Sequence, residues 1–147
     1  MGREILLKGK ALNKGIFEGE AIVSSTPFGF YRAVVPQTGI VRDTRNELFG
    51  QKISGKVLVF PEGRGSTSGA MMIAELARMG THFGAMINRK TEPILATGVI
   101  LARIFYNQII PTVHYLDQDP LEVIETGDIV RVNGYSGEVI VKKKSPA

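Results

Sequence analysis

The stretch VLVFPEGRGSTSG, residues 57–69, decides the fold of this chain. Its first four residues are all apolar, two of them are β-branched, and Pro61 ends the run, so residues 57–60 predict a short strand buried on both faces. From Thr67 to Met79, apolar residues recur at intervals of three and four, and Gly80 follows them. This spacing predicts an amphipathic helix over residues 67–79 that ends at Gly80.

Ser66 lies where the chain enters this helix. The first N–H groups of a helix have no partner within the helix, and together with the macrodipole they favour negative charge in front of them. Arg64 adds a guanidinium suited to a carboxylate or a phosphate, and Gly65 lets a ligand approach the backbone. The segment therefore predicts an anion-binding site. The alternative is that Ser66 or Thr67 only caps the helix, since both are common capping residues.

The composition is that of one ordinary globular domain spanning residues 1–147. The chain is 44% hydrophobic and 22% charged, which argues against disorder. Its net charge of +4 is partly concentrated in Lys142-Lys143-Lys144. A three-residue basic tail without interleaved aromatic residues is typical of a solvated chain end, so no nucleic-acid partner is expected.

The chain contains no cysteine, which excludes disulfides, a cysteine nucleophile and thiolate metal ligands from within it. His82 and His114 are the two histidines, and their 32-position separation does not suggest a metal site. Each is expected to be structural or on the surface. No apolar run approaches the ~18 residues that span a bilayer, and charged residues near the start argue against a signal peptide. A cytoplasmic protein without a membrane partner is expected.

Other periodicities extend the prediction to a layered α/β domain. A strand over residues 83–88 after the helix predicts a right-handed crossover with parallel strands. Thr91 is expected to cap a buried helix over residues 94–104 with Pro93 in its first turn. The other expected elements are strands at residues 4–12, 19–24, 39–42 and 110–113, a short helix at 119–125, and a hairpin of 128–132 with 138–141.

Several pieces of this sequence, taken in order, resemble the small subunit of the aconitase X family, whose fold is the swivelling β/β/α domain. No single piece is diagnostic, but their order and spacing cover nearly the whole chain. They are GIFEGEAIV at residues 15–23, TGIVRD at 38–43, GKVLVFPEGRGSTSG at 55–69, TEPILATG at 91–98, ETGD at 125–128 and GEV at 137–139.

The resemblance implies a hydro-lyase assembled from two subunits, as a heterodimer or a higher assembly. In this family a large subunit carries an iron–sulfur cluster, and the small subunit docks over it to complete the site for a small carboxylate substrate. Archaeal members convert 5-phosphomevalonate to trans-anhydromevalonate 5-phosphate in a modified mevalonate route to isoprenoids. A bacterial branch dehydrates cis-3-hydroxy-L-proline, which remains the alternative substrate. The absence of cysteine fits cluster ligands that all lie in the partner.

Carried over to this sequence, the family's catalytic serine falls on Ser66. The resemblance implies that Ser66 accepts the proton from the carbon beside the carboxylate, while the cluster iron acts on the departing hydroxyl. The candidate substrate-binding residues are Arg64, Gly65, Thr67 and Ser68. Asp43 matches the family's Thr-Gly-x-x-x-Asp piece and is either a site residue or a turn residue.

Some segments depart from the family pattern, among them Asn107-Gln108 and His114-Tyr115, and another one bears on the substrate. Residues 30–34, which include Arg32, stand where a glycine-rich loop is expected. Two alternatives from other functional classes also remain. A phosphohistidine carrier on the same fold needs a histidine at a loop tip, and residues 66–68 supply none. A non-catalytic regulator would use the same anion site without chemistry.

Overall fold

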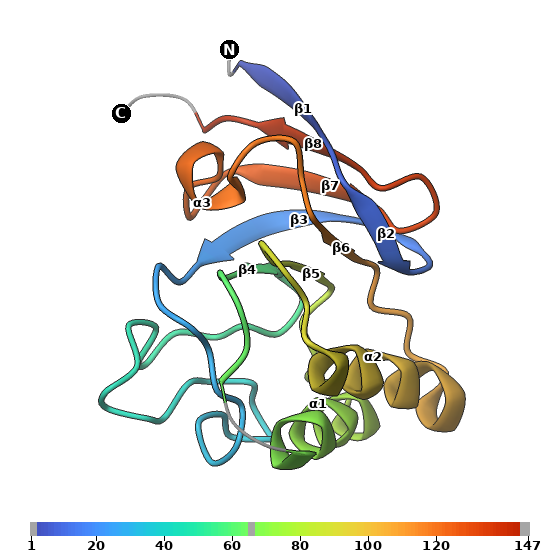
Figure 1. The fold of residues 1–147 in the computed structure, drawn as a ribbon. Coiled ribbons are helices and arrows are strands. Elements are labelled where there is room, and N and C mark those ends of the chain that lie inside the picture. Colours follow the sequence, from blue (N-terminus) through green and yellow to red (C-terminus); the bar gives the residue numbers. More distant parts are fainter. Residues whose placement is uncertain (1–2, 65–66, 145–147) are drawn as a thin grey trace.

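The computed structural model describes residues 3–64 and 67–144, whose strands form one sheet in the order β1-β8-β7-β3-β4-β5-β6-β2. Two longer helices cover one side of it, and a short third helix precedes the last two strands (Figure 1). In chain order the elements are β1 (Glu4–Lys8), β2 (Lys10–Asn13), β3 (Ile16–Val23), β4 (Val57–Val59), α1 (Thr67–Met79), β5 (Ala85–Ile87), α2 (Pro93–Tyr106), β6 (Thr112–His114), α3 (Pro120–Val123), β7 (Ile129–Asn133) and β8 (Glu138–Lys142).

Strand β3 joins the two halves of the sheet. Its residues 16–20 pair antiparallel with β7, and its residues 21–23 pair parallel with β4. Strands β4, β5 and β6 are parallel neighbours, which confirms the predicted strand–helix–strand unit with parallel strands. The strand predicted at residues 4–12 is two strands, because the chain turns at Gly9, whose N–H donates to the Gly137 carbonyl oxygen. Strands β1 and β2 follow one another in the chain, yet they form the two opposite edges of the sheet. The sheet must therefore curve so that its two edges come close together.

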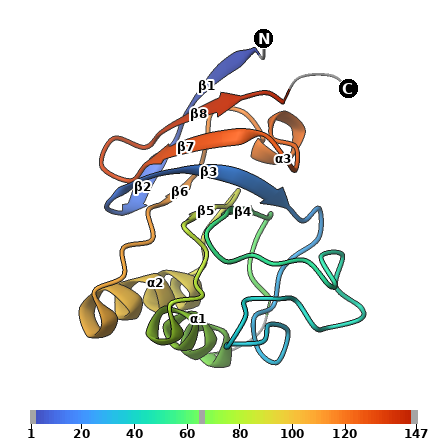
Figure 2. The ribbon, with the colours of Figure 1, turned by 180° about the vertical axis from the view of Figure 1, so that it is seen from behind.

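The alternation of side chains along β4 separates two cores. Val57 and Val59 join the cluster between the two halves of the sheet, whereas Leu58 and Phe60 join the cluster beneath the helices. All four side chains are fully buried, so the predicted strand covered on both faces is confirmed. The resulting order of layers, sheet on sheet on helices, is the β/β/α arrangement predicted from the resemblance (Figures 1 and 2).

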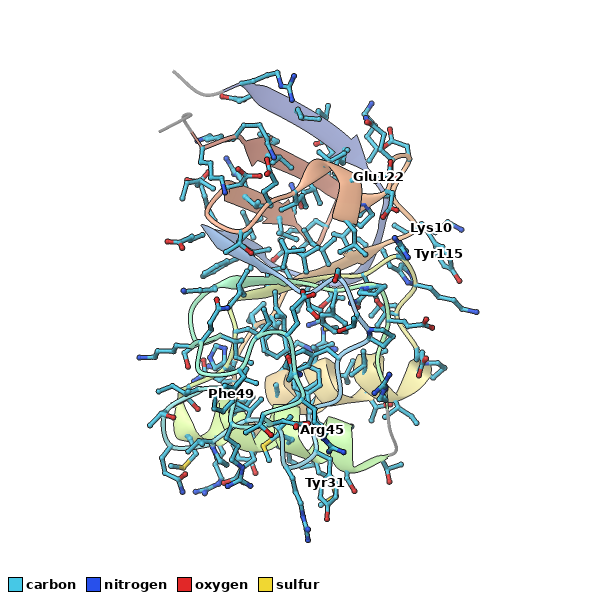
Figure 3. The ribbon with its side chains drawn as sticks, turned by 90° about the vertical axis from the view of Figure 1, so that its left-hand side faces the viewer. Lys10, Tyr31, Arg45, Phe49, Tyr115 and Glu122 are labelled. Carbon is cyan, nitrogen blue, oxygen red and sulfur yellow. The ribbon has the colours of Figure 1, made fainter. Side chains whose placement is uncertain are left out.

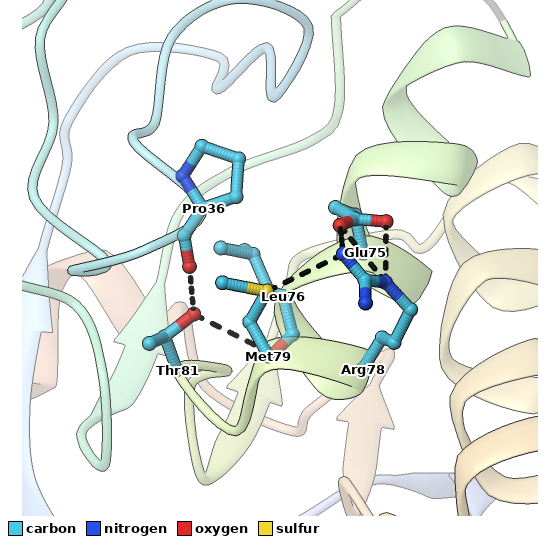
Figure 4. Close-up of polar contacts among 6 residues, drawn as sticks. All are labelled: Pro36, Glu75, Leu76, Arg78, Met79 and Thr81. Atoms are coloured by element: carbon cyan, nitrogen blue, oxygen red, sulfur yellow. Dashed lines mark hydrogen bonds and ion pairs between the residues drawn. The ribbon is translucent and has the colours of Figure 1, made fainter.

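Helix α1 occupies the predicted residues. Gly80 follows it at φ +74°, and the N–H of Thr81 donates to the Leu76 carbonyl oxygen over 2.9 Å, closing the last turn. The Thr81 hydroxyl also donates to the Pro36 carbonyl oxygen over 2.5 Å (Figure 4). Nearby, Arg78 and Glu75 form an ion pair on the exposed helix surface. The end of α1 is thus tied to the connection between β3 and β4.

Helix α2 differs from its prediction in two respects. Its N-cap is Glu92, without a side-chain capping bond, so the assignment of Thr91 as N-cap was wrong. The Thr91 hydroxyl instead donates to the side-chain oxygen of Asn88, and both residues are buried. Furthermore, α2 buries only one face, because Ile104 and Phe105 near its end are largely exposed.

The connection over residues 24–56 contains no strand at the predicted residues 39–42. Two isolated bridges stand there instead, Val34 with Val41 and Ile40 with Lys52. The connection nevertheless packs tightly, because the rings of Phe28 and Phe30 lie fully buried in the core against the helices. Long connections of this kind are usually functional in compact domains.

The last strands agree with the predicted hairpin, and the basic tail folds back onto the domain. Lys142 pairs with Glu18, and Lys143 pairs with the fully buried Asp128. Within residues 3–64 and 67–144, no helix combines the length and apolar character that crossing a membrane requires.

Candidate functional site

The loop between β4 and α1 carries the predicted catalytic residue. Ser66 and its neighbour Gly65 lie outside the described residues, and in the sequence they stand between Arg64 and Thr67. Helix α1 begins at Thr67 and has no acidic residue in its first turn. The positive end of its dipole is therefore not neutralised by a side chain of the helix itself.

Main-chain bonds fix the loop before that helix. Phe28 donates its N–H to the Glu62 carbonyl oxygen over 3.1 Å, and Arg64 donates its N–H to the Phe28 carbonyl oxygen over 3.0 Å. On the other side, a Cβ added to Gly63 would lie 2.6 Å from a terminal methyl carbon of Leu95 in the first turn of α2. The loop is thus wedged between the connection and α2, which sets where Arg64 emerges.

A pocket of about 350 Å³ opens beside Arg64. It lies between the connection's first loop, residues 26–31, and its second loop, residues 43–46. The pocket brings together Arg64 and Asp43, two residues proposed from sequence, whereas Thr67 and Ser68 are not among its described lining residues. Its lining consists of Thr26, Pro27, Gly29, Tyr31, Asp43, Arg45, Asn46 and Arg64.

Asp43 forms a turn at the edge of this pocket. Its Oδ1 accepts the N–H of Arg45 over 3.0 Å and the Nε–H of the same residue over 3.3 Å. The backbone bond chiefly, with help from the side chain and charge of Arg45, holds the pKa of Asp43 below its ordinary value. The sequence left Asp43 as either a turn residue or a site residue. The structure shows it as a turn residue that also lines the pocket.

The pocket is cationic in the part that the structure describes. Two guanidinium groups, of Arg45 and Arg64, face one carboxylate, that of Asp43. The guanidinium of Arg32 is not part of the lining but lies 5.1 Å from the ring centroid of the lining residue Tyr31. Arg32 takes a left-handed backbone conformation at φ +57°, which glycine adopts more readily than arginine.

The two loops that form the pocket walls are clasped together. Glu47 accepts the backbone N–H of Ser25 over 2.7 Å and its hydroxyl over 2.5 Å. Figure 3 shows Tyr31 and Arg45 near each other at the helical end of the molecule, away from β1. The buried rings of Phe28 and Phe30 lie in the same connection and give it a rigid base.

Both histidines are accounted for by local structure. The Nδ1 of His114 accepts the N–H of Thr91 over 3.0 Å, and burial together with the charge of Lys10 lowers the pKa of His114. The Nδ1 of His82 lies 2.9 Å from the Phe83 carbonyl oxygen. Among the described residues, no three His, Asp or Glu side chains gather as a metal site would require.

Sequence reasoning missed Thr26, Tyr31, Arg45 and Asn46 as lining residues. Arg45 and Asn46 stand next to the singled-out Asp43, which was the available signal. Thr26 and Tyr31 belong to a loop whose sequence has no periodic pattern. Its one signal was that residues 30–34 depart from the family pattern.

Comparison with known proteins places these features in a family. A sequence model of the aconitase X swivel domain matches residues 6–141. The phosphomevalonate dehydratase small subunit of Methanosarcina acetivorans is 42% identical over 95% of this chain and 94% of its own length. That of Methanocaldococcus jannaschii is 44% identical over 94% of this chain and 98% of its own.

A solved structure agrees with the sequence comparisons. The crystal structure of Thermococcus kodakaraensis aconitase X, in its holo-form, superposes with a TM-score of 0.85 at 40% identity, covering 95% of this chain and 99% of that one. The family model, the sequence relatives and the solved structure all identify the same family. The chain therefore belongs to the aconitase X family as a swivel domain.

Proposed function

We propose that this chain is the small subunit of a phosphomevalonate dehydratase, which removes water from (R)-5-phosphomevalonate to give trans-anhydromevalonate 5-phosphate. The observation that carries the proposal is the match to curated small subunits of that name over nearly the full length of both chains. The name small subunit implies a larger partner, so activity is expected only in a complex. Such a complex would work in the cytoplasm.

The elimination breaks a C–H bond beside the substrate carboxylate and a C–O bond on the next carbon. The C–H electron pair becomes the new double bond, the proton goes to the base, and the hydroxyl leaves with the C–O electron pair as hydroxide. The proton removed and the hydroxide released together make up the one water that is lost. In the proposal Ser66 accepts the proton. A serine hydroxyl is a weak base, so its activation must come from the positive start of α1, from Arg64 and from exclusion of water when the partner docks.

Arg64 and the first N–H groups of α1 are suited to hold the substrate carboxylate. The main chain of Arg64 is fixed by its bond to Phe28, and α1 begins three residues later at Thr67. The same groups would stabilise the enolate-like charge that develops on the carboxylate as the proton leaves. Gly65 would allow close approach of the substrate, and Thr67 and Ser68 supply further hydroxyl and N–H donors.

An iron–sulfur cluster does not fit this chain. Cysteine is absent from the sequence, and the described histidines and carboxylates form no metal-binding group. We therefore assign the cluster to the large subunit, and none of the roles proposed above passes through it.

The test is to purify this chain without oxygen from its native cells and to assay the isolated assembly. The proposal expects a larger, cysteine-bearing, iron-containing partner and loss of water from 5-phosphomevalonate. Turnover of cis-3-hydroxy-L-proline instead would transfer the chain to the other branch of the family. Dehydration by the isolated chain without partner or iron would overturn the two-subunit proposal.

A further inference from the structure

We propose that the pocket between residues 26–31 and 43–46 is a second anion subsite that binds the phosphate at the far end of the substrate, with Arg45 as its specificity-determining residue. The inference rests on the proposed function for the identity of the anion. Its structural basis is independent of Ser66, because every residue that carries it is described.

The lining chemistry favours a phosphate. Besides Arg45 and Arg64, the pocket presents the amide of Asn46 and the hydroxyls of Thr26 and Tyr31, all able to donate to phosphate oxygens. The volume of about 350 Å³ suits a small ligand. The substrate of the proposed function carries a carboxylate at one end and a phosphate at the other, and the two guanidinium groups of the pocket belong to different loops. Arg64 is suited to the first anion, and Arg45, whose side chain meets Asp43 through Nε alone, is suited to the second.

The two terminal nitrogens of the Arg45 guanidinium remain available to a ligand. Asp43 engages Nε and the backbone N–H of Arg45, which orients the side chain without occupying the two terminal nitrogens. In residues 3–64 and 67–144, those terminal nitrogens have no other partner, and the Arg45 side chain is 89% exposed. Asp43 is thus a positioning residue for Arg45. This role explains why a carboxylate is present in a site proposed to bind anions.

The position of the pocket links it to the reaction. Arg64 belongs both to the pocket and to the loop that leads into α1, so one molecule can extend from the helix start into the pocket. The two hydrogen bonds between Ser25 and Glu47 join the walls of the pocket in the absence of a ligand. Such preorganisation lowers the cost of ordering the site on binding.

The chain contains a matched control for Arg45. Arg78 is also an exposed arginine paired with a nearby carboxylate, Glu75, but it lies in the last turn of α1 and not in the pocket. Arg45→Gln and Arg78→Gln therefore remove the same charge from similar pairs. Only the first change touches the proposed subsite.

The experiment measures kcat and KM for 5-phosphomevalonate, and binding and inhibition by inorganic phosphate, in the assembled complex. Arg45→Gln should raise KM about tenfold to a hundredfold, as expected for a lost hydrogen bond to a charged group, with kcat within about twofold. It should also weaken phosphate inhibition, Arg45→Lys should restore part of both, and Arg78→Gln should change neither.

The outcomes separate this inference from the proposed function. If the complex dehydrates 5-phosphomevalonate but Arg45→Gln leaves KM and phosphate inhibition unchanged, the subsite is overturned and the function stands. If the complex does not act on that substrate yet binds inorganic phosphate in an Arg45-dependent manner by calorimetry, the subsite stands and the function falls. Absence of phosphate binding and of any Arg45 effect overturns the subsite.

Discussion

The N–H of Arg64 donates to the carbonyl oxygen of Phe28 over 3.0 Å, and this bond joins the loop before α1 to the wall of the basic pocket. Phe28 is fully buried, so the bond anchors Arg64 to the hydrophobic core and not to a mobile surface loop. The candidate proton acceptor follows two residues later in the sequence. The core of the domain therefore positions the residues proposed to hold substrate.

Gly63→Ala tests how tightly this loop is wedged. The added Cβ would lie 2.6 Å from one methyl carbon of Leu95 and 2.9 Å from its Cγ, so the buried Leu95 side chain, α2 or the loop must move. We expect a loss of about 1–3 kcal/mol in the free energy of unfolding, measured by urea denaturation, together with reduced turnover. In Gly63→Ala/Leu95→Ala the clash is removed, so the double variant should lose less stability than the two single losses combined. Strict additivity would show that the contact does not constrain the loop.

Gly39→Ala tests the Thr-Gly-x-x-x-Asp piece against a matched glycine. Gly39 and Gly50 both have positive φ, at +75° and +83°. A Cβ at Gly50 meets nothing within 4 Å, whereas one at Gly39 would lie 1.8 Å from the Ser54 hydroxyl oxygen and 2.9 Å from the Thr81 carbonyl oxygen. Gly50→Ala should therefore cost the backbone strain of about 1–2 kcal/mol alone.

Gly39→Ala should cost clearly more than Gly50→Ala, by roughly another 1–3 kcal/mol, because it also displaces Ser54 from its bonds to the carbonyl oxygens of Thr38 and Thr81. Thermal or urea unfolding of the two variants under the same conditions measures the difference. Equal losses would mean that the Ser54 contacts are of no consequence.

Asp128→Asn tests the buried ion pair at the other end of the domain. Burial raises the pKa of Asp128, but bonds from Lys143 and from the N–H groups of Glu125 and Lys144 outweigh it, so the pKa lies below its ordinary value. The substitution should lower stability at pH 7 by on the order of 2–3 kcal/mol. Glu18→Gln, which breaks the exposed pair with Lys142, should change it little.

The pH dependence of this pair has a defined sign. Because the folded pKa of Asp128 is depressed, its contribution is present above the unfolded value of about 3.9 and is lost as the pH falls through the folded value. The stability difference between the native chain and Asp128→Asn should therefore shrink below about pH 4. Urea denaturation from pH 7 to pH 3 measures it, and a difference that grows on acidification would refute the pairing.

The sequence predicted the elements that repeat a local pattern. The run 57–60 and the spacing of residues 67–79 each carry a strong signal, since burial on both faces and a 3.6-residue period leave few alternatives. Thr91 was misassigned as a helix cap because a buried hydrogen bond to Asn88 overrides its capping preference. Likewise, residues 39–42 have strand-like composition but find no partner strand beyond isolated bridges.

The pocket was beyond the reach of the sequence for a related reason. Arg64 could be proposed because it precedes a helix start. Tyr31 and Arg45 line the same pocket in a connection whose loops are joined by the Ser25–Glu47 bonds and by the bridge between Phe28 and Gly63. These contacts link positions far apart in the chain. Such contacts depend on tertiary packing and leave no periodic trace.

Ser66→Ala in the assembled complex tests the central claim most directly, with Ser136→Ala in the β7–β8 turn as the matched loss of a hydroxyl. Our account predicts that Ser66→Ala lowers kcat for loss of water from 5-phosphomevalonate by roughly 10²–10⁴-fold, as for loss of a general base, while the complex stays assembled by gel filtration. Ser136→Ala should retain full turnover. A Ser66→Ala complex that stays within a few fold of native turnover would contradict the account and favour a regulatory subunit.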